Sequence, residues 1–422
     1  MTVFVSVLGA MLLLEELFVQ PTRVSLIILS ILAAIVIFFT FIYCYAFVCI
    51  IYCFYFCTRV HKTYVKFICI TQYTNVLKMS KRKISIADIA RRAGVSHSTV
   101  SRALRDSPLI SPKVRAEIKQ LAREMRYVPN AIAQSLQTQR TNTIGVVVTS
   151  IADPFYAEVV EGIEQVARTA GLSVLLSASH RDFDQEIAAI DNFHRRRVDG
   201  ILLTDSRISK HNTKQVEQIT VPTVLINSQT KDQPEIFHSV AINDYLGATL
   251  AVEHLISLGH TSIGYLGVGD RSKSNQQRLE GYQITLSKAG LPQVPEWVAI
   301  NVEEQTRIND VDTGQKMLPK LLNTEITGIF CYNDMIAIGV LLACHELGIS
   351  IPQDLSLVGF DGIALSRYVT PSLTTVCQPM LEIGRSAMQM LLDLLEEKTI
   401  ENRVVSPFLV KRGSSAVVKN TF

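Results

Sequence analysis

The sequence predicts an α/β protein in which a small all-α region precedes a larger region built on parallel sheets. Apolar residues recur at helical spacing from residue 86 to residue 125, and from residue 143 onward short apolar runs alternate with amphipathic helices. Charge divides the chain too, although its net charge is only +3. Residues 79–140 hold 13 Lys and Arg against 4 Asp and Glu, a net charge of +9, whereas residues 141–422 hold 23 against 32, a net charge of −9. This asymmetry is typical of a chain in which one part binds phosphate.

Two helices around a central glycine begin the all-α region. The apolar face of the first helix consists of Ile86, Ile89, Ala90 and Ala93. Gly94 stands where the chain must reverse, and Ser96 is a favourable N-cap for a second helix that runs to Leu104. A third helix is predicted over residues 112–125, with Ser111 as its N-cap and a proline at its first position. This pattern predicts a helix-turn-helix unit.

The second helix presents short or cationic side chains on its outward side. They are His97, Ser98, Thr99, Ser101 and Arg102. We expect His97, Ser98 and Arg102 to read bases, with Arg102 as the candidate for a bidentate contact with guanine. Thr99 and Ser101 are expected to contact phosphates. An ordinary helical hairpin is the alternative interpretation, and the basic charge of this region speaks against it.

A short linker helix is predicted over residues 130–137, between Pro129 and a polar stretch, with Asn130 as its N-cap. A helix of about eight residues is too short to be stable alone in water. If it forms only on DNA and beside a second copy of the chain, its folding is coupled to binding. Leu136 is the unusual residue here, because its apolar side chain stands beside polar ones. Without other information it is a packing residue of an interdomain linker.

The α/β region follows from its alternating pattern. Strands are predicted at residues 144–149, 173–179, 200–205, 223–227, 262–267, 328–333 and 355–360. Helices are predicted at residues 155–171, 184–197, 247–259, 335–348 and 383–397. Several helices end at a glycine, as C-caps do: Gly171, Gly259 and Gly348. Alternation of this kind implies parallel sheets with helices on both faces. About 280 residues is long for one such sheet and ample for two.

Ligands bind beyond the carboxyl ends of strands in open parallel sheets. This rule selects Asp153, Phe155, Asp205, Ser206, Asn333, Asp334 and Asp361, together with Arg278 at a predicted helix start. Carboxylates, an amide and a guanidinium beside an aromatic ring suit a polyhydroxyl ligand. For Asp153 and Asn333 helix capping is the alternative, since each precedes a helix.

The sequence gives little support to an enzyme or a metal site. It has no phosphate-binding Walker loop and no nucleophile elbow, and its nine histidines form no metal-binding pattern. Cys331, Cys344 and Cys377 stand singly on apolar segments, where buried small side chains are expected. We therefore predict neither catalytic residues nor a cofactor.

From residue 83 to its end the chain resembles the lactose-repressor/galactose-repressor family of bacterial transcription regulators. The matching segments are ISIADIARRAGVSHSTVSRAL (84–104), YVPNAIAQSL (127–136), TIGVVV (143–148), DPF (153–155), RLEG (278–281), YNDM (332–335), VGFD (358–361) and LVKRGSS (409–415). They occur in family order over roughly 340 residues, so the resemblance is specific. Two departures concern the ligand: Asn243-Asp244 stands where family members often have Asp-Asn, and Gly362 follows Asp361 where a second acid is common.

The resemblance implies a core of two similar subdomains related to periplasmic sugar-binding proteins, with a cleft between them and more than one crossing of the chain. It implies effector contacts by Arg278, Asn333 and Asp361, and less surely by Asp153 and Phe155. It adds Asn130, Ala133 and Leu136 to the DNA-contacting residues, with Leu136 as a wedge inserted into the minor groove. The implied partners are a palindromic operator, a sugar-like small-molecule effector and a second copy of the chain. Because no leucine heptads follow the core, a homodimer is expected rather than a tetramer.

The first 78 residues lie outside the resemblance. Residues 24–58 contain no Asp, Glu, Lys or Arg, and this run of 35 residues exceeds the roughly 20 needed to cross a bilayer. One interpretation is a transmembrane anchor, which would make the protein a membrane-anchored transcriptional sensor. The other is that translation starts at Met79, where the basic Ser-Lys-Arg-Lys segment opens the resemblance. We favour the second, because five of the eight cysteines fall before Met79 in a protein otherwise expected to be cytoplasmic.

The sequence thus predicts four segments: an apolar extension (1–78), a helix-turn-helix domain (79–128), a hinge helix (129–140) and an effector-binding and dimerisation core (141–422). The predicted function is that of a transcriptional regulator, a repressor of carbohydrate-metabolism genes, switched by a sugar-like effector. A periplasmic solute-binding protein is the remaining alternative, and the basic N-terminal region contradicts it.

Overall fold

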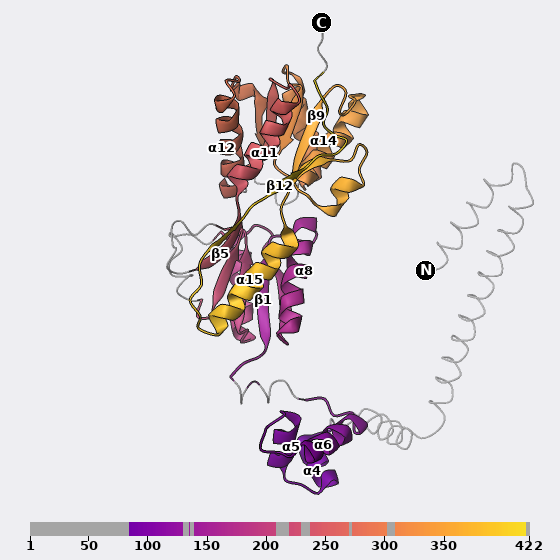
Figure 1. The fold of residues 1–422 in the computed structure, drawn as a ribbon, viewed down its shortest axis with the longest axis vertical. Coiled ribbons are helices and arrows are strands. Elements are labelled where there is room, and N and C mark those ends of the chain that lie inside the picture. Colours follow the sequence, from indigo (N-terminus) through magenta and orange to yellow (C-terminus); the bar gives the residue numbers. More distant parts are fainter. Residues whose placement is uncertain are drawn as a thin grey trace, which may run out of the picture. The chain divides into compact units, whose positions relative to one another are not determined.

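The computed structural model describes residues 84–129, 135, 139–207, 219–228, 237–269, 272–301 and 309–418. The chain divides into two units, one that ends at Val128 and one that begins at Pro129 (Figure 1). The predicted apolar extension (1–78) and the hinge residues Asn130, Ala133 and Leu136 lie outside the described residues.

Three helices form the first unit: α4 (Ile86–Ala93), α5 (His97–Leu104) and α6 (Pro112–Glu124). The predicted caps are confirmed, because the side chains of Ser96 and Ser111 accept hydrogen bonds from backbone N–H groups of their helices. Gly94 has φ +67°, a left-handed conformation that costs glycine little and that ends α4. The helices bury one apolar cluster, centred on Ile89, Val100, Ala103, Ile118 and Ala122.

The second unit contains two six-stranded sheets, and the predicted fold class is confirmed. The first sheet has the order β11-β5-β4-β3-β1-β2. Its strands are β1 (Thr143–Val148), β2 (Ser173–Ala178), β3 (Gly200–Thr204), β4 (Thr223–Ile226), β5 (His238–Ile242) and β11 (Arg403–Val405). Its helices are α8 (Pro154–Thr169), α9 (Phe183–Arg195) and α15 (Met380–Leu395). Within the described residues its neighbouring strands pair in the parallel sense, as expected for strands joined by helices.

The second sheet has the order β12-β10-β9-β8-β6-β7. Its strands are β6 (Ile263–Val268), β7 (Val298–Asn301), β8 (Gly328–Cys331), β9 (Ser356–Asp361), β10 (Thr374–Cys377) and β12 (Phe408–Val410). Its helices are α11 (Asp244–Ser257), α12 (Ser272–Lys288), α13 (Asp310–Leu322) and α14 (Asp334–Leu347), with short 3₁₀ turns at Pro295–Trp297 and Ala364–Arg367. The sheet is parallel as predicted, except at one edge, where β12 pairs with β10 in the antiparallel sense.

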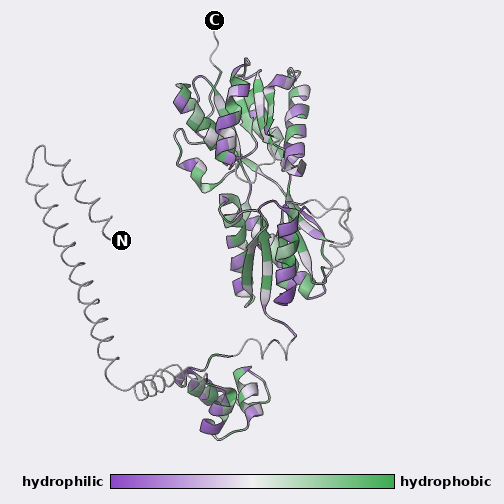
Figure 2. Ribbon diagram, turned by 180° about the vertical axis from the view of Figure 1, so that it is seen from behind, coloured by the Kyte–Doolittle hydropathy of each residue, from purple (hydrophilic) through white to green (hydrophobic). Residues whose placement is uncertain are grey.

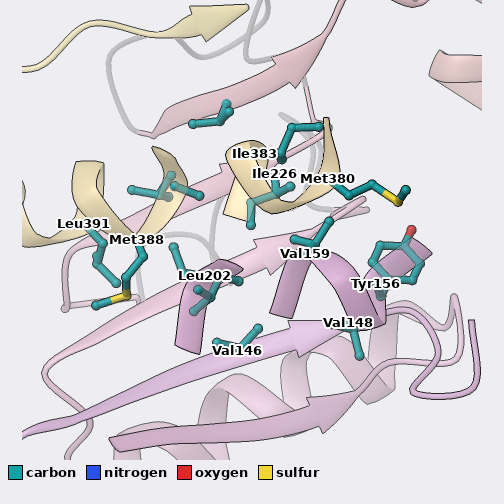
Figure 3. Packing of buried hydrophobic residues seen from close by; sticks show 14 of the residues in the cluster. Val146, Val148, Tyr156, Val159, Leu202, Ile226, Met380, Ile383, Met388 and Leu391 are labelled. Carbon is teal, nitrogen blue, oxygen red and sulfur yellow. The ribbon is translucent and has the colours of Figure 1, made fainter. Parts of the chain in front are cut away.

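Both faces of each sheet are covered by helices. Successive side chains of a strand point to opposite faces, so each buried strand contributes to two apolar clusters. In the first sheet Val146 and Leu202 belong to the cluster under α8 and α15, whereas Val147 and Leu203 pack against α9. Figure 3 shows Val159 of α8 and Ile383 and Leu391 of α15 on one side of these strands. Figure 2 shows the central strands as mostly hydrophobic, whereas the helices carry both hydrophilic and hydrophobic residues.

The chain passes between the two sheets at three places: between β5 and α11, between β10 and α15, and between β11 and β12. The predicted non-contiguous subdomains are therefore confirmed. The last long helix, α15, returns to the first sheet and packs on α8, where Gly162 and Gly384 let the two backbones approach. A β-carbon at either glycine would collide with a carbonyl oxygen of the facing helix.

Among the described residues no helix is both long and apolar enough to span a membrane. The predicted apolar run at residues 24–58 is outside that part of the chain, so both interpretations of it stay predictions.

Candidate functional site

The first candidate site is the outward side of α5. His97, Ser98 and Arg102 are exposed, whereas Val100 and Ala103 are buried against α4 and α6. The helix thus separates an anchoring face from a face that is free to meet a groove of DNA. The three residues expected to read bases are all on the exposed face, and their contacts with bases stay predictions.

Thr99 and Ser101 are placed differently from their three exposed neighbours. Both are half-buried. The Thr99 hydroxyl lies 2.8 Å from the hydroxyl of the N-cap Ser96, and Arg105 donates to the Ser101 hydroxyl over 2.9 Å. Each hydroxyl therefore has a partner within the first unit, and Ser101, whose oxygen accepts a hydrogen bond from Arg105, can still donate its own proton to a phosphate. Their predicted role as phosphate contacts is compatible with these bonds and is not tested by them.

The second candidate site is a cavity of the α/β unit at the carboxyl ends of strands from both sheets. About 380 Å³ of space, including the open mouth, lies within it. Its lining residues are Asp153, Phe155, Tyr156, Asp205, Asn227, Ile242, Asp244, Ser274, Arg278, Tyr332, Asn333, Asp361 and Gln378.

Arg278 is the charged centre of this cavity. It is only 4% exposed, and its Nε donates to the carboxylate of Asp244 over 2.8 Å. Its Nη1 donates to the backbone carbonyl of Tyr332 and lies 3.8 Å from Oδ1 of Asp361. The guanidinium is also stacked, with its carbon 4.3 Å from the ring centre of Tyr332 and 3.7 Å from that of Phe360. Burial opposes the charge, but the neighbouring carboxylates outweigh it and raise the pKa of Arg278, which stays protonated.

Asp361 lies on the second-sheet side of the cavity. The Gln378 side-chain amide donates to its Oδ1 over 2.7 Å. Burial raises the pKa of Asp361 well above its usual range, although Arg278 opposes the shift. Asp361 ends β9 at φ +107°, a conformation that L residues rarely adopt. Strain of this kind, about 1 to 3 kcal/mol, is found mainly at functional sites.

Asp205 lies on the first-sheet side of the cavity, directly after β3. It is half-buried, and the Tyr156 hydroxyl donates to its carboxylate. Burial raises the pKa of Asp205 to about 7, and the nearby carboxylates of Asp244 and Asp153 add to the shift. Asp205 has φ +42° and Asn227, directly after β4, has φ +57°. Residues with positive φ thus follow or end three strands at the cavity.

The structure brings together the five residues predicted to contact the effector: Asp153, Phe155, Arg278, Asn333 and Asp361 all line the cavity. The capping alternative also applies to two of them. Asp153 accepts a hydrogen bond from the backbone N–H of Phe155, and Asn333 accepts one from Ile336. Asn333 is not limited to capping, since its Nδ2 donates to Asp310 over 2.6 Å.

Three details of the predicted cleft are wrong. Arg278 lies within α12 and not at its start. Ser206 does not line the cavity, because it donates to the buried carboxylate of Glu186. Asp334 is fully buried and accepts hydrogen bonds from the backbone N–H groups of Gly362 and Ile363, so it supports the turn after Asp361 rather than lining the cavity.

Sequence reasoning missed six polar or aromatic lining residues: Tyr156, Asn227, Asp244, Ser274, Tyr332 and Gln378. Asn227 was the last residue of a predicted strand, so the carboxyl-end rule pointed to it. Gln378 follows β10, which was not predicted. Asp244 follows the cap Asn243 of α11, and the swapped Asn-Asp order was the available signal.

Comparison with known families finds two matches along the chain. Residues 85–130 match the family described as bacterial regulatory proteins, lacI family, and residues 252–415 match the periplasmic binding protein-like domain. The ribose operon repressor of Haemophilus influenzae is 34% identical over 337 residues, which cover 78% of this chain and 98% of that protein. The transcriptional repressor PurR of Proteus mirabilis is 32% identical over 336 residues, 79% of this chain and 97% of the relative.

The chain belongs to the lacI family of bacterial regulatory proteins. It is a DNA-binding transcriptional repressor with an effector-binding domain. Transcription regulators of this family are not enzymes.

Solved structures of lacI-family regulators agree with this assignment. The lac repressor dimer bound to operator and an anti-inducer is similar with a TM-score of 0.70 and 26% identity, over 79% of this chain and 100% of that one. A lacI-family regulator of Enterococcus faecium with bound ribose is similar with a TM-score of 0.58 and 27% identity, over 66% of this chain and 100% of that one. Operator DNA and a small-molecule effector are the partners typical of the family.

Proposed function

We propose that this lacI-family protein is a homodimeric repressor of carbohydrate-metabolism genes, and that a sugar-like effector bound in the cavity switches its affinity for a palindromic operator. The observation that carries the proposal is the composition of the cavity. Carboxylates and amides from both sheets surround it beside Phe155, Tyr156 and Tyr332. Such groups pair with adjacent hydroxyls, and aromatic rings cover the apolar faces of a sugar.

The position of the cavity supports a switch. Asp153, Asp205 and Asn227 belong to the first sheet and its connections, whereas Arg278, Asn333 and Asp361 belong to the second. A ligand that contacts both groups favours the arrangement of subdomains in which all contacts are made at once. Only such a difference in affinity between two arrangements drives a conformational change.

On the DNA side, we propose that two copies of α5 enter successive major grooves and that Arg102 reads a guanine. Arg102→Ala is expected to weaken specific operator binding by about 1 to 3 kcal/mol, because a bidentate pair contributes this much discrimination. The matched control is Arg123→Ala, which removes an exposed arginine from α6. Equal losses in the two variants, measured by fluorescence anisotropy at one salt concentration, would contradict the assignment.

Leu136 keeps its proposed role as the wedge between central base pairs, which comes from the family resemblance. Leu136→Ala is expected to reduce the bend angle of operator DNA and to leave effector binding intact. An unchanged bend angle in a gel-phasing assay would refute the wedge.

The central experiment measures operator binding in the presence of a panel of pentoses, hexoses and disaccharides. At least one sugar is expected to change operator affinity by fivefold or more, in the range of typical allosteric coupling of about 5- to 150-fold. Arg278→Ala is expected to abolish this response and to retain operator binding. If the Arg278→Ala protein responds to the sugar as the wild type does, the cavity is not the effector site.

A further inference from the structure

Three consecutive arginines, Arg195, Arg196 and Arg197, form a corner of the core at the C-terminal end of α9. Residues 141–422 have a net charge of −9, and they contain no other run of three Lys or Arg. The three side chains are exposed, and none of them forms an ion pair with another described residue. A cation in the last turn stabilises a helix, and Arg195 alone supplies it. The remaining charge of this arginine corner is available to a partner.

The linker from the DNA-binding unit enters the core at the arginine corner. The Thr141 hydroxyl donates to the backbone carbonyl of Arg197 over 2.7 Å, and the Thr141 N–H donates to the carboxylate of Asp199 over 2.9 Å. The Asp199 N–H in turn donates to the carbonyl of Thr143, the first residue of β1. The arginines therefore lie beside the segment that connects the core to the helix-turn-helix unit.

The charges at this end of the core differ between the two sides of the first sheet. The arginine corner belongs to the α9 side, whereas α15 packs on the opposite side. Arg140 of the linker donates to the carbonyl of Leu395, so α15 also ends near the linker, and the exposed residues that follow it include Glu396, Glu397 and Glu401. A polyanion that approaches this end is attracted to the α9 side and repelled from the α15 side.

We propose that the arginine corner binds the phosphate backbone of the DNA that the helix-turn-helix unit holds, so that the core makes a sequence-independent DNA contact of its own. Guanidinium groups suit this partner, because each can donate two parallel hydrogen bonds to one phosphate. The predicted hinge helix of about eight residues spans only about 12 Å, which keeps the corner close to DNA bound beside that helix. The inference goes beyond the proposed function, because it requires the DNA-binding activity of the family and no particular effector.

The test is the salt dependence of DNA binding by the full chain without effector. The probe is a duplex that the wild type selects from a random-sequence pool, and fluorescence anisotropy measures its affinity between about 50 and about 200 mM salt. Each phosphate contact contributes about 0.9 to the slope of log affinity against log salt concentration. The double variant Arg195→Gln/Arg196→Gln is therefore expected to lower the slope by about 1.8. The affinity advantage of the wild type should fall about 12-fold over this salt range.

The matched control is Lys288→Gln/Lys320→Gln. It also removes two exposed cations from the last turns of helices, α12 and α13, which end at the amino ends of the second sheet's strands and thus on the far side of the cavity. Equal slopes in the two double variants overturn the inference. Sedimentation equilibrium without DNA tests a second copy of the chain as the partner instead. Weaker self-association of the arginine variant assigns the corner to that copy and also overturns the inference.

Arg197→Gly separates the loss of charge from a loss of folding. Arg197 follows α9 with φ +55°, in the left-handed region that glycine adopts freely, as Gly171 does after α8. The variant is expected to unfold at the same temperature as the wild type or at a higher one, and still to lower the salt slope by about 0.9. It decides the question if the double variant does not fold, because a well-folded Arg197→Gly protein with the wild-type slope then contradicts the phosphate contact.

Discussion

Replacement of Asp205 by asparagine is expected to stabilise the ligand-free protein, and by more as the pH rises. The carboxyl group of Asp205 lies at the cavity wall with the Tyr156 hydroxyl as its donor. Burial raises its pKa from 3.8 to about 7. Asparagine has the same shape, keeps an oxygen for Tyr156 and carries no charge, so the substitution removes the ionisation with little change of packing.

The magnitude follows from linkage between protonation and folding. From pH 3.8 to about pH 7 the folded chain holds a proton on Asp205 that the unfolded chain has released, so the folded state loses stability as the pH rises through this window. One pKa unit corresponds to ~1.36 kcal/mol, so the group costs roughly 2 kcal/mol near pH 5 and roughly 4 kcal/mol near pH 8. The advantage of Asp205→Asn over the wild type should therefore grow by about 2 to 3 kcal/mol between these pH values.

Urea unfolding of wild type and variant at the two pH values, followed by circular dichroism, measures this difference directly. Glu325→Gln, at an exposed carboxyl group, controls for the loss of one charge and should give a difference that changes little with pH. The comparison is made without effector, since a ligand bound only to the folded state adds its own stabilisation. If the advantage of Asp205→Asn is the same at both pH values, Asp205 is ionised normally in the folded protein and the argument from burial is wrong.

Two further predictions concern packing and the link between the subdomains. Gly384→Ala is expected to destabilise the protein by about 1 to 3 kcal/mol, because the new methyl group collides with the carbonyl of Val159 across the α8–α15 contact. The control is Gln389→Ala on the exposed side of α15, which should change stability by less than about 0.5 kcal/mol. Thermal unfolding checks both, and equal small effects would show that the helices can separate without loss. Asp310 accepts a hydrogen bond from the cavity residue Asn333, and its Oδ1 lies 3.9 Å from Nη2 of Arg181 beside the other sheet. Asp310→Asn is therefore expected to weaken effector affinity by about two- to tenfold and to leave operator affinity unchanged. A double-mutant cycle with Arg181→Ala measures the coupling, and strict additivity would sink the idea that this pair joins the two sides.

Much of the fold was predictable because its signals are local. Ser96 and Ser111 cap their helices, and Gly94, Gly171, Gly259 and Gly348 have positive φ where the sequence predicted helix ends. The alternation of apolar strands and amphipathic helices predicted the parallel sheets. Asp153, Phe155, Asn333 and Asp361 followed from the rule that strand ends carry ligand-binding groups, and Arg278 from the family resemblance; all five line one cavity.

The elements that sequence reasoning missed depend on distant partners. Strand β10 reads as a threonine-rich segment, and it is a strand because β9 and β12 pair with its two edges. The three-residue strands β11 and β12 are joined to sheets whose other strands come more than 100 and more than 30 residues earlier. Without β10 there was no reason to select Gln378, which directly follows it.

Adjacent polar residues are the other difficulty for sequence reasoning. Asn333 and Asp334 both follow β8, yet the first lines the cavity and the second is buried beneath the turn at Gly362. Capping explains the division, because the N-cap lies at the helix end with its side chain turned back, while the next residue already has the helical direction. The pattern of residue types alone carries no information on which of the two faces the ligand.

The cavity carries costs that a well-packed interior would avoid: a buried guanidinium, carboxyl groups with raised pKa values, and positive φ at Asp205 and Asp361. To move a two-state equilibrium from 1:99 to 99:1, a ligand needs a differential affinity of about 5.5 kcal/mol. Hydrogen bonds from the ligand to both sheets contribute to this difference, since all of them are made in only one arrangement of the subdomains. The destabilising groups are thus gathered where a donor-rich ligand relieves them in one arrangement of the subdomains, which is the condition for effector binding to change the affinity for DNA.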